Sequence, residues 1–137
     1  MDRTVSNQTP ELSHADSALH ERILAGHLAI LAQVDYFREN FGRAESRWKK
    51  DGTRVTIVDE TISRELFILL EKDFPSDDYC SEEEAETPEP IPTEAEFCWI
   101  LDPVDGTNNY AVGVPECCIS LGLLRHGIPV CAFIYDY

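Results

Sequence analysis

The feature that most constrains the fold is a short, continuous apolar segment that ends in two carboxylates. Phe97–Leu101 has the length and composition of a buried β-strand. Residues 102–107 follow directly and read Asp-Pro-Val-Asp-Gly-Thr. Because a charge at the edge of a core is costly unless it is paired or bound to a metal, this strand end needs an explanation.

Helices are predicted before this strand. Residues 9–11, Thr-Pro-Glu, are typical of a helix start, and an apolar stripe predicts one long helix that ends near Gly42. A second helix is expected to open at Asp59 and to end near residues 74–78. The long stripe consists of Leu12, Ala15, Leu19, Ile23, Ile30, Val34, Phe37 and Phe41, and the second apolar face consists of Ile62, Leu66, Leu69, Leu70 and Phe74.

Strands and loops complete the expected pattern. Further short strands are predicted at Arg54–Val58, Tyr79–Ser81, Ile119–Leu124 and Val130–Tyr135. In the first of these, helix capping by Thr56 is an alternative. Residues 126–129 fit a hairpin turn, and residues 49–53 a turn or loop. The acidic, Pro-bearing stretch up to residue 96 predicts an exposed loop, and residues 1–10 a flexible tail.

Charge and cysteine usage limit the partners. The net charge is −15, with 26 acidic against 11 basic residues, which disfavours nucleic acid and anionic membrane as partners. Five cysteines without a Cys-x-x-Cys pair predict neither a closed disulfide framework nor a zinc knuckle. With no signal-peptide pattern and no run long enough to span a membrane, we expect a cytoplasmic chain.

The segment from Asp102 to Thr107 carries the candidate chemistry. Pro103 stiffens the turn, which can aim both carboxylates and the Val104 carbonyl at one point. Hard oxygen ligands of this kind suit Mg²⁺, Mn²⁺ or Ca²⁺ rather than zinc. The N–H groups of Gly106 and Thr107, at an expected helix start, can bind phosphate. The alternative is an Asp-Pro turn followed by an Asp helix cap, whereas the spacing excludes an EF-hand.

The motif Asp-Pro-x-Asp-Gly-Thr-x-Asn-aromatic at residues 102–110 resembles the signature of the inositol monophosphatase family. Lys50–Thr53 with Val55, Thr56 and Asp59 is similar to the first block of that family. Ser81–Glu83 is similar to its Gly-Glu-Glu block, although Ser81 replaces the usual glycine. Pro115, Ser120-Leu121 and residues 132–135 also resemble the family, so the likeness covers roughly residues 12–137.

The resemblance implies an α+β fold, the layered αβαβα sandwich of the sugar-phosphatase type. Residues 11–137 would be its N-terminal, metal-binding half, with two helices packed on a mainly antiparallel sheet. The C-terminal half of the family pattern, with a further metal-ligand Asp and most substrate contacts, is absent from these residues. We therefore expect the chain alone to be inactive and the complete protein to form a homodimer.

The resemblance also implies roles for individual residues. Glu82, Asp102 and the Val104 carbonyl would hold a first Mg²⁺, and Asp102 and Asp105 would share in a second. Glu83 would be an acid behind this metal site, and Lys50 a nearby cation. The catalytic residues would be Asp59, Thr107 and Glu82, with the first two orienting and deprotonating water. Phosphate would be bound by Gly106, Thr107 and Asp105.

The implied activity is Mg²⁺-dependent hydrolysis of inositol monophosphate or a related sugar or polyol phosphate, with sensitivity to Li⁺. The same chemistry on histidinol phosphate, a nucleotide phosphate or fructose bisphosphate is an alternative. A second alternative of another class is a non-catalytic, Mg²⁺-binding interaction module.

Overall fold

The computed structural model describes residues 13–83, 91 and 94–137. The predicted tail at residues 1–10, the predicted helix start at residues 9–11 and most of the predicted acidic loop lie outside these residues. In the described part the elements are α1 His14–Leu31, α2 Val34–Asn40, β1 Ser46–Trp48, β2 Arg54–Thr56, α3 Ile57–Asp73, β3 Asp78–Ser81, β4 Phe97–Asp105, α4 Thr107–Val112, β5 Cys118–Arg125 and β6 Ile128–Asp136.

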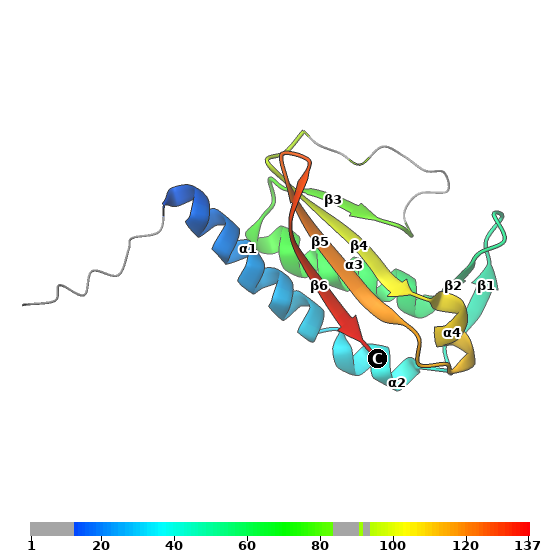
Figure 1. Cartoon of the computed structure of the whole chain (residues 1–137). Coiled ribbons are helices and arrows are strands. Elements are labelled where there is room, and N and C mark those ends of the chain that lie inside the picture. The colour runs from blue at the N-terminus through cyan, green and yellow to red at the C-terminus, as the bar shows by residue number, and fades with distance from the viewer. Residues whose placement is uncertain (1–12, 84–90, 92–93) are drawn as a thin grey trace, which may run out of the picture.

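The main sheet has the strand order β3-β4-β5-β6. The pair β3–β4 is parallel, and the other two pairs are antiparallel. The helices α1 and α3 run along one face of this sheet, while the separate hairpin β1–β2 and α4 lie near the end of β4 (Figure 1). The expected α+β architecture, with two helices packed on a mainly antiparallel sheet, is confirmed.

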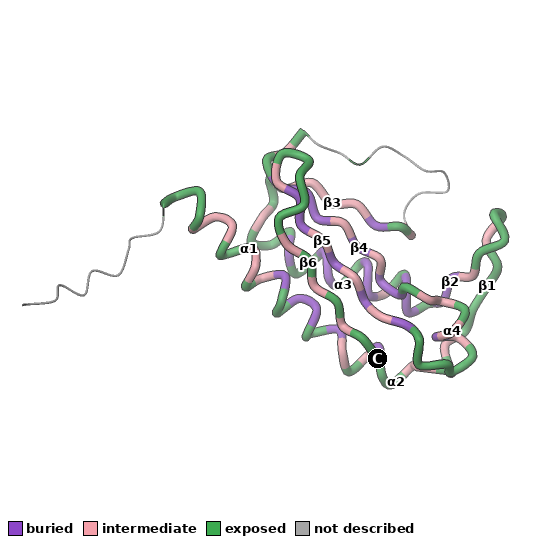
Figure 2. The backbone as a smooth tube through the Cα atoms, viewed as in Figure 1, coloured by how far each residue is buried: buried purple, intermediate pink, exposed green. Residues whose placement is uncertain are grey.

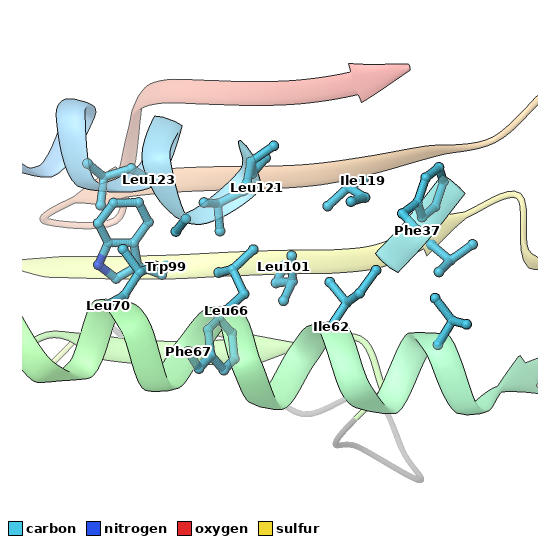
Figure 3. Close-up of a cluster of buried hydrophobic side chains, with 14 of the residues drawn as sticks. Phe37, Ile62, Leu66, Phe67, Leu70, Trp99, Leu101, Ile119, Leu121 and Leu123 are labelled. Carbon is cyan, nitrogen blue, oxygen red and sulfur yellow. The ribbon is translucent and has the colours of Figure 1, made fainter. Parts of the chain in front are cut away.

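The core lies between this sheet face and α3. Trp99 and Leu101 of β4 pair with Leu123 and Leu121 of β5, so the four side chains share the helix-covered face. They pack with residues such as Leu66 in one cluster (Figure 3). Burial follows β4, β5 and α3, whereas the edge strand β6 is exposed along much of its length (Figure 2).

The prediction of one long N-terminal helix is wrong. The helix α1 begins at His14 after the N-cap Ser13 and ends at Leu31. A new helix then starts after Gln33, whose side chain is buried. The break lets Phe37 pack against Tyr110, with ring centroids 4.8 Å apart, while the Tyr110 hydroxyl donates to the Phe37 carbonyl at 2.6 Å. This contact ties α2 to α4, which a straight continuation of α1 does not do.

A half-buried ion pair and a close approach fasten α1 to the sheet. Asp77 accepts from Arg22 Nε at 2.8 Å, from Arg22 Nη2 at 2.7 Å and from Trp99 Nε1 at 2.9 Å. Gly26 lets the helix lie against the sheet, since an added Cβ would stand 2.7 Å from Phe133 and 2.9 Å from Trp99. The N-terminal helix is therefore held by specific contacts as well as by apolar burial.

Local turns differ from the expected ones in extent. The β5–β6 hairpin turns on two residues rather than four, because His126 and Gly127 both have positive φ, at 50° and 76°, as a type I′ turn requires. The segment Arg54–Val58 contains both predicted alternatives, since β2 ends at Thr56 and Thr56 caps α3. The strand β1 was not predicted.

Free thiols are found at Cys98, Cys117, Cys118 and Cys131. Among the helices that the structure describes, none is both long and apolar enough to cross a lipid bilayer.

Candidate metal and phosphate site

A β-bulge places the two motif carboxylates on one face of the sheet. Asp102 pairs with Ser120, but Asp105 pairs with Cys118, so three steps on β4 match two steps on β5. Because cross-strand partners share a face, Asp102 and Asp105 both lie on the face opposite Leu101. A regular strand would put them on opposite faces. The strand therefore continues through Asp105 rather than ending at Asp102, and the expected stiff turn is a bulge.

Gly106 forms the junction between this bulge and α4. Its φ of 83° lies in the left-handed region, and an added Cβ would stand 2.6 Å from the Glu116 carbonyl oxygen. Asn109 Nδ2 also donates to that oxygen at 3.0 Å. Since Thr107 is the first residue of α4, its N–H has no partner within the helix. The predicted helix start is confirmed, and this N–H is available to an anion.

Asp59 connects the start of α3 to this junction. Its Oδ2 accepts from Thr56 N at 2.7 Å and from Thr56 Oγ1 at 2.6 Å, which completes a capping box. Its Oδ1 accepts from Thr107 Oγ1 at 3.2 Å, while the same hydroxyl also lies 2.9 Å from the Val104 carbonyl oxygen. Asp59 is fully buried, and this burial raises its pKa despite the donors from Thr56 and Thr107. Asp59 is therefore both an acid that caps the start of α3 and the hydrogen-bond partner of Thr107.

Glu82 and Asp102 come together from neighbouring strands. Glu82 follows β3, and its N–H donates to the Leu101 carbonyl oxygen at 3.0 Å. Burial, the hydrogen bond with Glu82 and the negative charges of Glu82, Asp105 and Asp59 raise the pKa of Asp102 to about 8. The crowding of negative charge thus favours the protonated form of Asp102 when no cation is bound.

An open hollow of about 380 Å³ collects most of the predicted site residues. It is lined by Lys49, Thr53, Arg54, Glu82, Glu83, Asp102, Val104, Asp105, Gly106, Thr107, Asn108 and Asn109. Asp59 does not line it and reaches it only through the hydroxyl of Thr107. Lys50 does not line it either.

Lys49 is a cation beside these acids, one position before the Lys50 that the resemblance implied there. Lys49 Nζ lies 2.7 Å from Glu83 Oε2, whose side chain is 6% exposed. Burial lowers the pKa of Lys49, but Glu83, Glu82 and Asp51 outweigh it and raise the value above the usual one. Burial likewise raises the pKa of Glu83 in spite of Lys49. The two adjacent lysines could not be told apart by spacing alone, because the hairpin decides which one faces inward.

Two buried serines support the Glu82–Glu83 segment. The hydroxyls of Ser81 and Ser63 are 2.6 Å apart, and Glu83 N donates to Ser81 Oγ at 3.3 Å. Both serines are at least 96% buried. Ser81, which stands where the family pattern has glycine, thus joins the acidic segment to α3. Ser63 could not have been found from sequence, since it lies within a helix face and only the packing brings it to β3.

The donor set fits a hard divalent cation in its chemistry. Asp102 Oδ1 is buried and has no hydrogen-bond partner among the described residues. The neighbouring donors are carboxylate and carbonyl oxygens, which Mg²⁺ prefers. Within residues 13–83, 91 and 94–137, no three Asp, Glu, His or Cys side chains are gathered closely enough to hold an ion. Glu82 and Asp105 are exposed, so they can reorient without disturbing the core.

Comparisons with known proteins show the family of this chain. The model of the Inositol monophosphatase family matches residues 14–137. Inositol monophosphatase 1 of Solanum lycopersicum is 37% identical over 82 residues, which are 60% of this chain and 30% of that protein. The fructose-1,6-bisphosphatase/inositol-1-monophosphatase of Aquifex aeolicus is 31% identical over 113 residues, which are 79% of this chain and 40% of that protein.

A solved structure of an IMPase/NADP phosphatase complexed with Mg²⁺ and phosphate is similar as well. It superposes with a TM-score of 0.69 at 28% identity, covering 85% of this chain and 44% of that one. The chain thus spans less than half the length of these relatives. Because the family model matches residues 14–137, this chain belongs to the inositol monophosphatase family.

Proposed function

We propose that this chain supplies the metal-binding and water-activating part of a Mg²⁺-dependent phosphate monoester hydrolase. The observation that carries the proposal is the contact between Thr107 Oγ1 and the fully buried Asp59 Oδ1, 3.2 Å apart, at the edge of the hollow that Asp102 lines. Membership in a phosphatase family supports hydrolysis of a phosphate ester as the reaction class. The Mg²⁺ dependence, the residue roles and the substrate are our proposals.

Thr107 and Asp59 are arranged to receive a proton from water. Thr107 Oγ1 carries one hydrogen, which it can donate either to Asp59 Oδ1 or to the Val104 carbonyl oxygen. When the hydroxyl takes a proton from water, its own proton passes to Asp59 Oδ1. Burial favours this transfer because it raises the pKa of Asp59. Thr56 holds the other oxygen, so the carboxylate keeps its orientation.

The metal ligands that we propose are Glu82, Asp102 and the Val104 carbonyl for one Mg²⁺, with Asp102 and Asp105 contributing to a second. Bound there, Mg²⁺ would supply charge neutralisation for phosphate oxygens and activation of the water nucleophile. The backbone at Gly106 and Thr107 would hold a phosphate oxygen at the start of α4.

The preferred substrate in this proposal is inositol monophosphate or a related sugar or polyol phosphate. The Aquifex relative, whose name includes both fructose-1,6-bisphosphatase and inositol-1-monophosphatase, keeps fructose bisphosphate as an alternative. Histidinol phosphate and nucleotide phosphates remain further alternatives. Inhibition by Li⁺ is expected, because the same small carboxylate sites would accept it.

A chimera tests the function. Residues 13–137 replace the matching part of the Aquifex aeolicus relative, and phosphate release from inositol 1-phosphate is measured with and without Mg²⁺. We expect Mg²⁺-dependent release that Glu82→Gln and Asp102→Asn each reduce at least about a hundredfold, since an amide is a poorer ligand than a carboxylate. Glu65→Gln, an exposed change on α3, is the charge-matched control.

Two results would count against the proposal. Turnover that survives either ligand substitution at saturating Mg²⁺ removes that residue from the site. A folded chimera that binds Mg²⁺ but releases no phosphate favours the non-catalytic interaction module instead.

A further inference from the structure

The hairpin β1–β2 concentrates positive charge in an acidic chain. Four of the 11 basic residues, Arg47, Lys49, Lys50 and Arg54, fall within eight consecutive positions, against a net charge of −15. The hairpin lies beside α4, at whose start we propose that the backbone binds phosphate (Figure 1). Such a local concentration of positive charge can attract an anion that the rest of the surface repels.

Two of these cations are matched by carboxylates, and Arg54 is held differently. Arg47 pairs with Glu60 and Lys49 pairs with Glu83. The Arg54 guanidinium carbon instead lies 4.5 Å from the centre of the Trp48 ring. In the described part of the chain, no ion pair joins Arg54 to a carboxylate, and its buried Nε has no hydrogen-bond partner.

The position of Arg54 connects it to the candidate site. Arg54 lines the same hollow as Asp102 and Thr107. A guanidinium presents its donors in a planar fork that matches two oxygens of a phosphate group. Because the guanidinium already lies over the Trp48 ring, less side-chain freedom is lost when an anion binds.

We propose that Arg54, held by Trp48, is an anion-binding residue of this site and binds phosphate oxygens of the ligand. The inference rests on the proposed function and extends it. The phosphate can be the group that is transferred or a second phosphate on the leaving group, and both present the same oxygens to the guanidinium.

The experiment is an NMR titration of the full 137-residue chain in Mg²⁺ buffer. The ligands are inositol 1-phosphate and inositol 1,4-bisphosphate. The Gly106 amide reports binding at the start of α4, while the Arg54 Nε–H and the Trp48 indole N–H report contact with the guanidinium. Dissociation constants are measured for Arg54→Gln and Arg54→Lys, with Arg47→Gln as the charge-matched control on the same hairpin.

We expect Arg54→Gln to weaken binding by roughly tenfold or more, the loss of a charge-assisted bidentate contact, while Arg47→Gln changes it little. Arg54→Lys should recover only part of the affinity, because it keeps the charge but not the fork. Weakening for both ligands assigns Arg54 to the transferred phosphate. Weakening for the bisphosphate alone assigns it to a second phosphate.

Two results would overturn the inference, and they differ from each other. If the Gly106 amide responds to ligand but Arg54→Gln binds as well as the unchanged chain, Arg54 serves only the hairpin and the proposed function stands. If the Gly106 amide does not respond to either ligand, the phosphate site itself fails, and the role of Arg54 fails with it. Well-dispersed backbone amide signals of the hairpin in ligand-free Arg54→Gln show that the hairpin remains folded.

Discussion

The substitution Asp59→Asn separates the structural role of this carboxylate from its proposed role as a proton acceptor. In the structure, Oδ2 accepts two bonds from Thr56 and Oδ1 accepts one from Thr107. An asparagine can keep its oxygen toward Thr56 and turn its amide nitrogen toward Thr107. The Thr107 hydroxyl can then accept from that nitrogen and still donate to the Val104 carbonyl. All four groups stay paired, but the amide cannot take a proton.

The expected loss of stability is small for this reason. The two hydrogen bonds from Thr56 lose their charge assistance, which costs about 1 kcal/mol each. The favourable interaction of a negative charge with the start of α3 is also lost, which costs about 0.5 kcal/mol. Removing a buried charge offsets part of this, so we expect about 1–2 kcal/mol in total. Asp59→Ala leaves the buried Thr56 donors without an acceptor and should cost about 3 kcal/mol or more.

The effect of Asp59→Asn should depend on pH in a defined direction. Burial raises the pKa of Asp59 in the folded chain above its unfolded value of about 3.9. The resulting stabilisation is complete below the unfolded pKa and is lost as the pH rises through the folded pKa. Asparagine does not titrate. The stability difference between the unchanged chain and Asp59→Asn should therefore shrink from pH 4 to pH 7.

Urea unfolding of the chain, followed by circular dichroism at several pH values, measures stability, and phosphate release by the chimera measures activity. We expect Asp59→Asn and Thr107→Val each to lower kcat by roughly a hundredfold or more. A kcat within a few-fold of the unchanged chimera would refute the proton-acceptor role. A loss of more than about 3 kcal/mol in Asp59→Asn would refute the hydrogen-bond rearrangement, because the amide then leaves donors unpaired.

Three further substitutions or additions have defined outcomes. Gly106→Ala should destabilise the chain by about 2–4 kcal/mol in urea unfolding, because the strain of a positive φ adds to a clash with the backbone. Gly52→Ala has a positive φ but open space around its Cβ, so it should cost only about 1 kcal/mol. Equal losses in the two variants would contradict the clash. Asp77→Asn should cost about 3 kcal/mol in the same assay, because it removes the charge that pairs with the half-buried Arg22. A loss below about 1 kcal/mol would show that the pair behaves as an exposed one. Mg²⁺ should raise the melting temperature more at pH 9 than at pH 6, because Asp102, whose pKa is about 8, must lose its proton before a cation binds. Asp102→Asn should abolish this difference. An equal Mg²⁺ effect at both pH values would argue against Asp102 as a ligand.

Much of the fold could be predicted because its signals are local. The apolar segment Phe97–Leu101 and the two strands after it are confirmed, since a short apolar run between turn residues has few alternatives. A helix start at Gly106 and Thr107 was also predicted, and α4 begins at Thr107. The chemistry of the candidate site follows in the same way, because oxygen donors of Asp and Glu favour hard cations wherever they meet.

The sequence by itself therefore determined most of the elements, the family and the candidate oxygen donors. Tertiary structure alone decided how they face one another. The bulge that turns Asp105 to the face of Asp102 depends on pairing with β5, and the choice of Lys49 over Lys50 depends on the β1–β2 hairpin. Ser63 reaches Ser81 only because α3 packs beside β3. Each of these is a contact between segments far apart in the chain, and residue spacing carries no information about the side on which a distant partner lies.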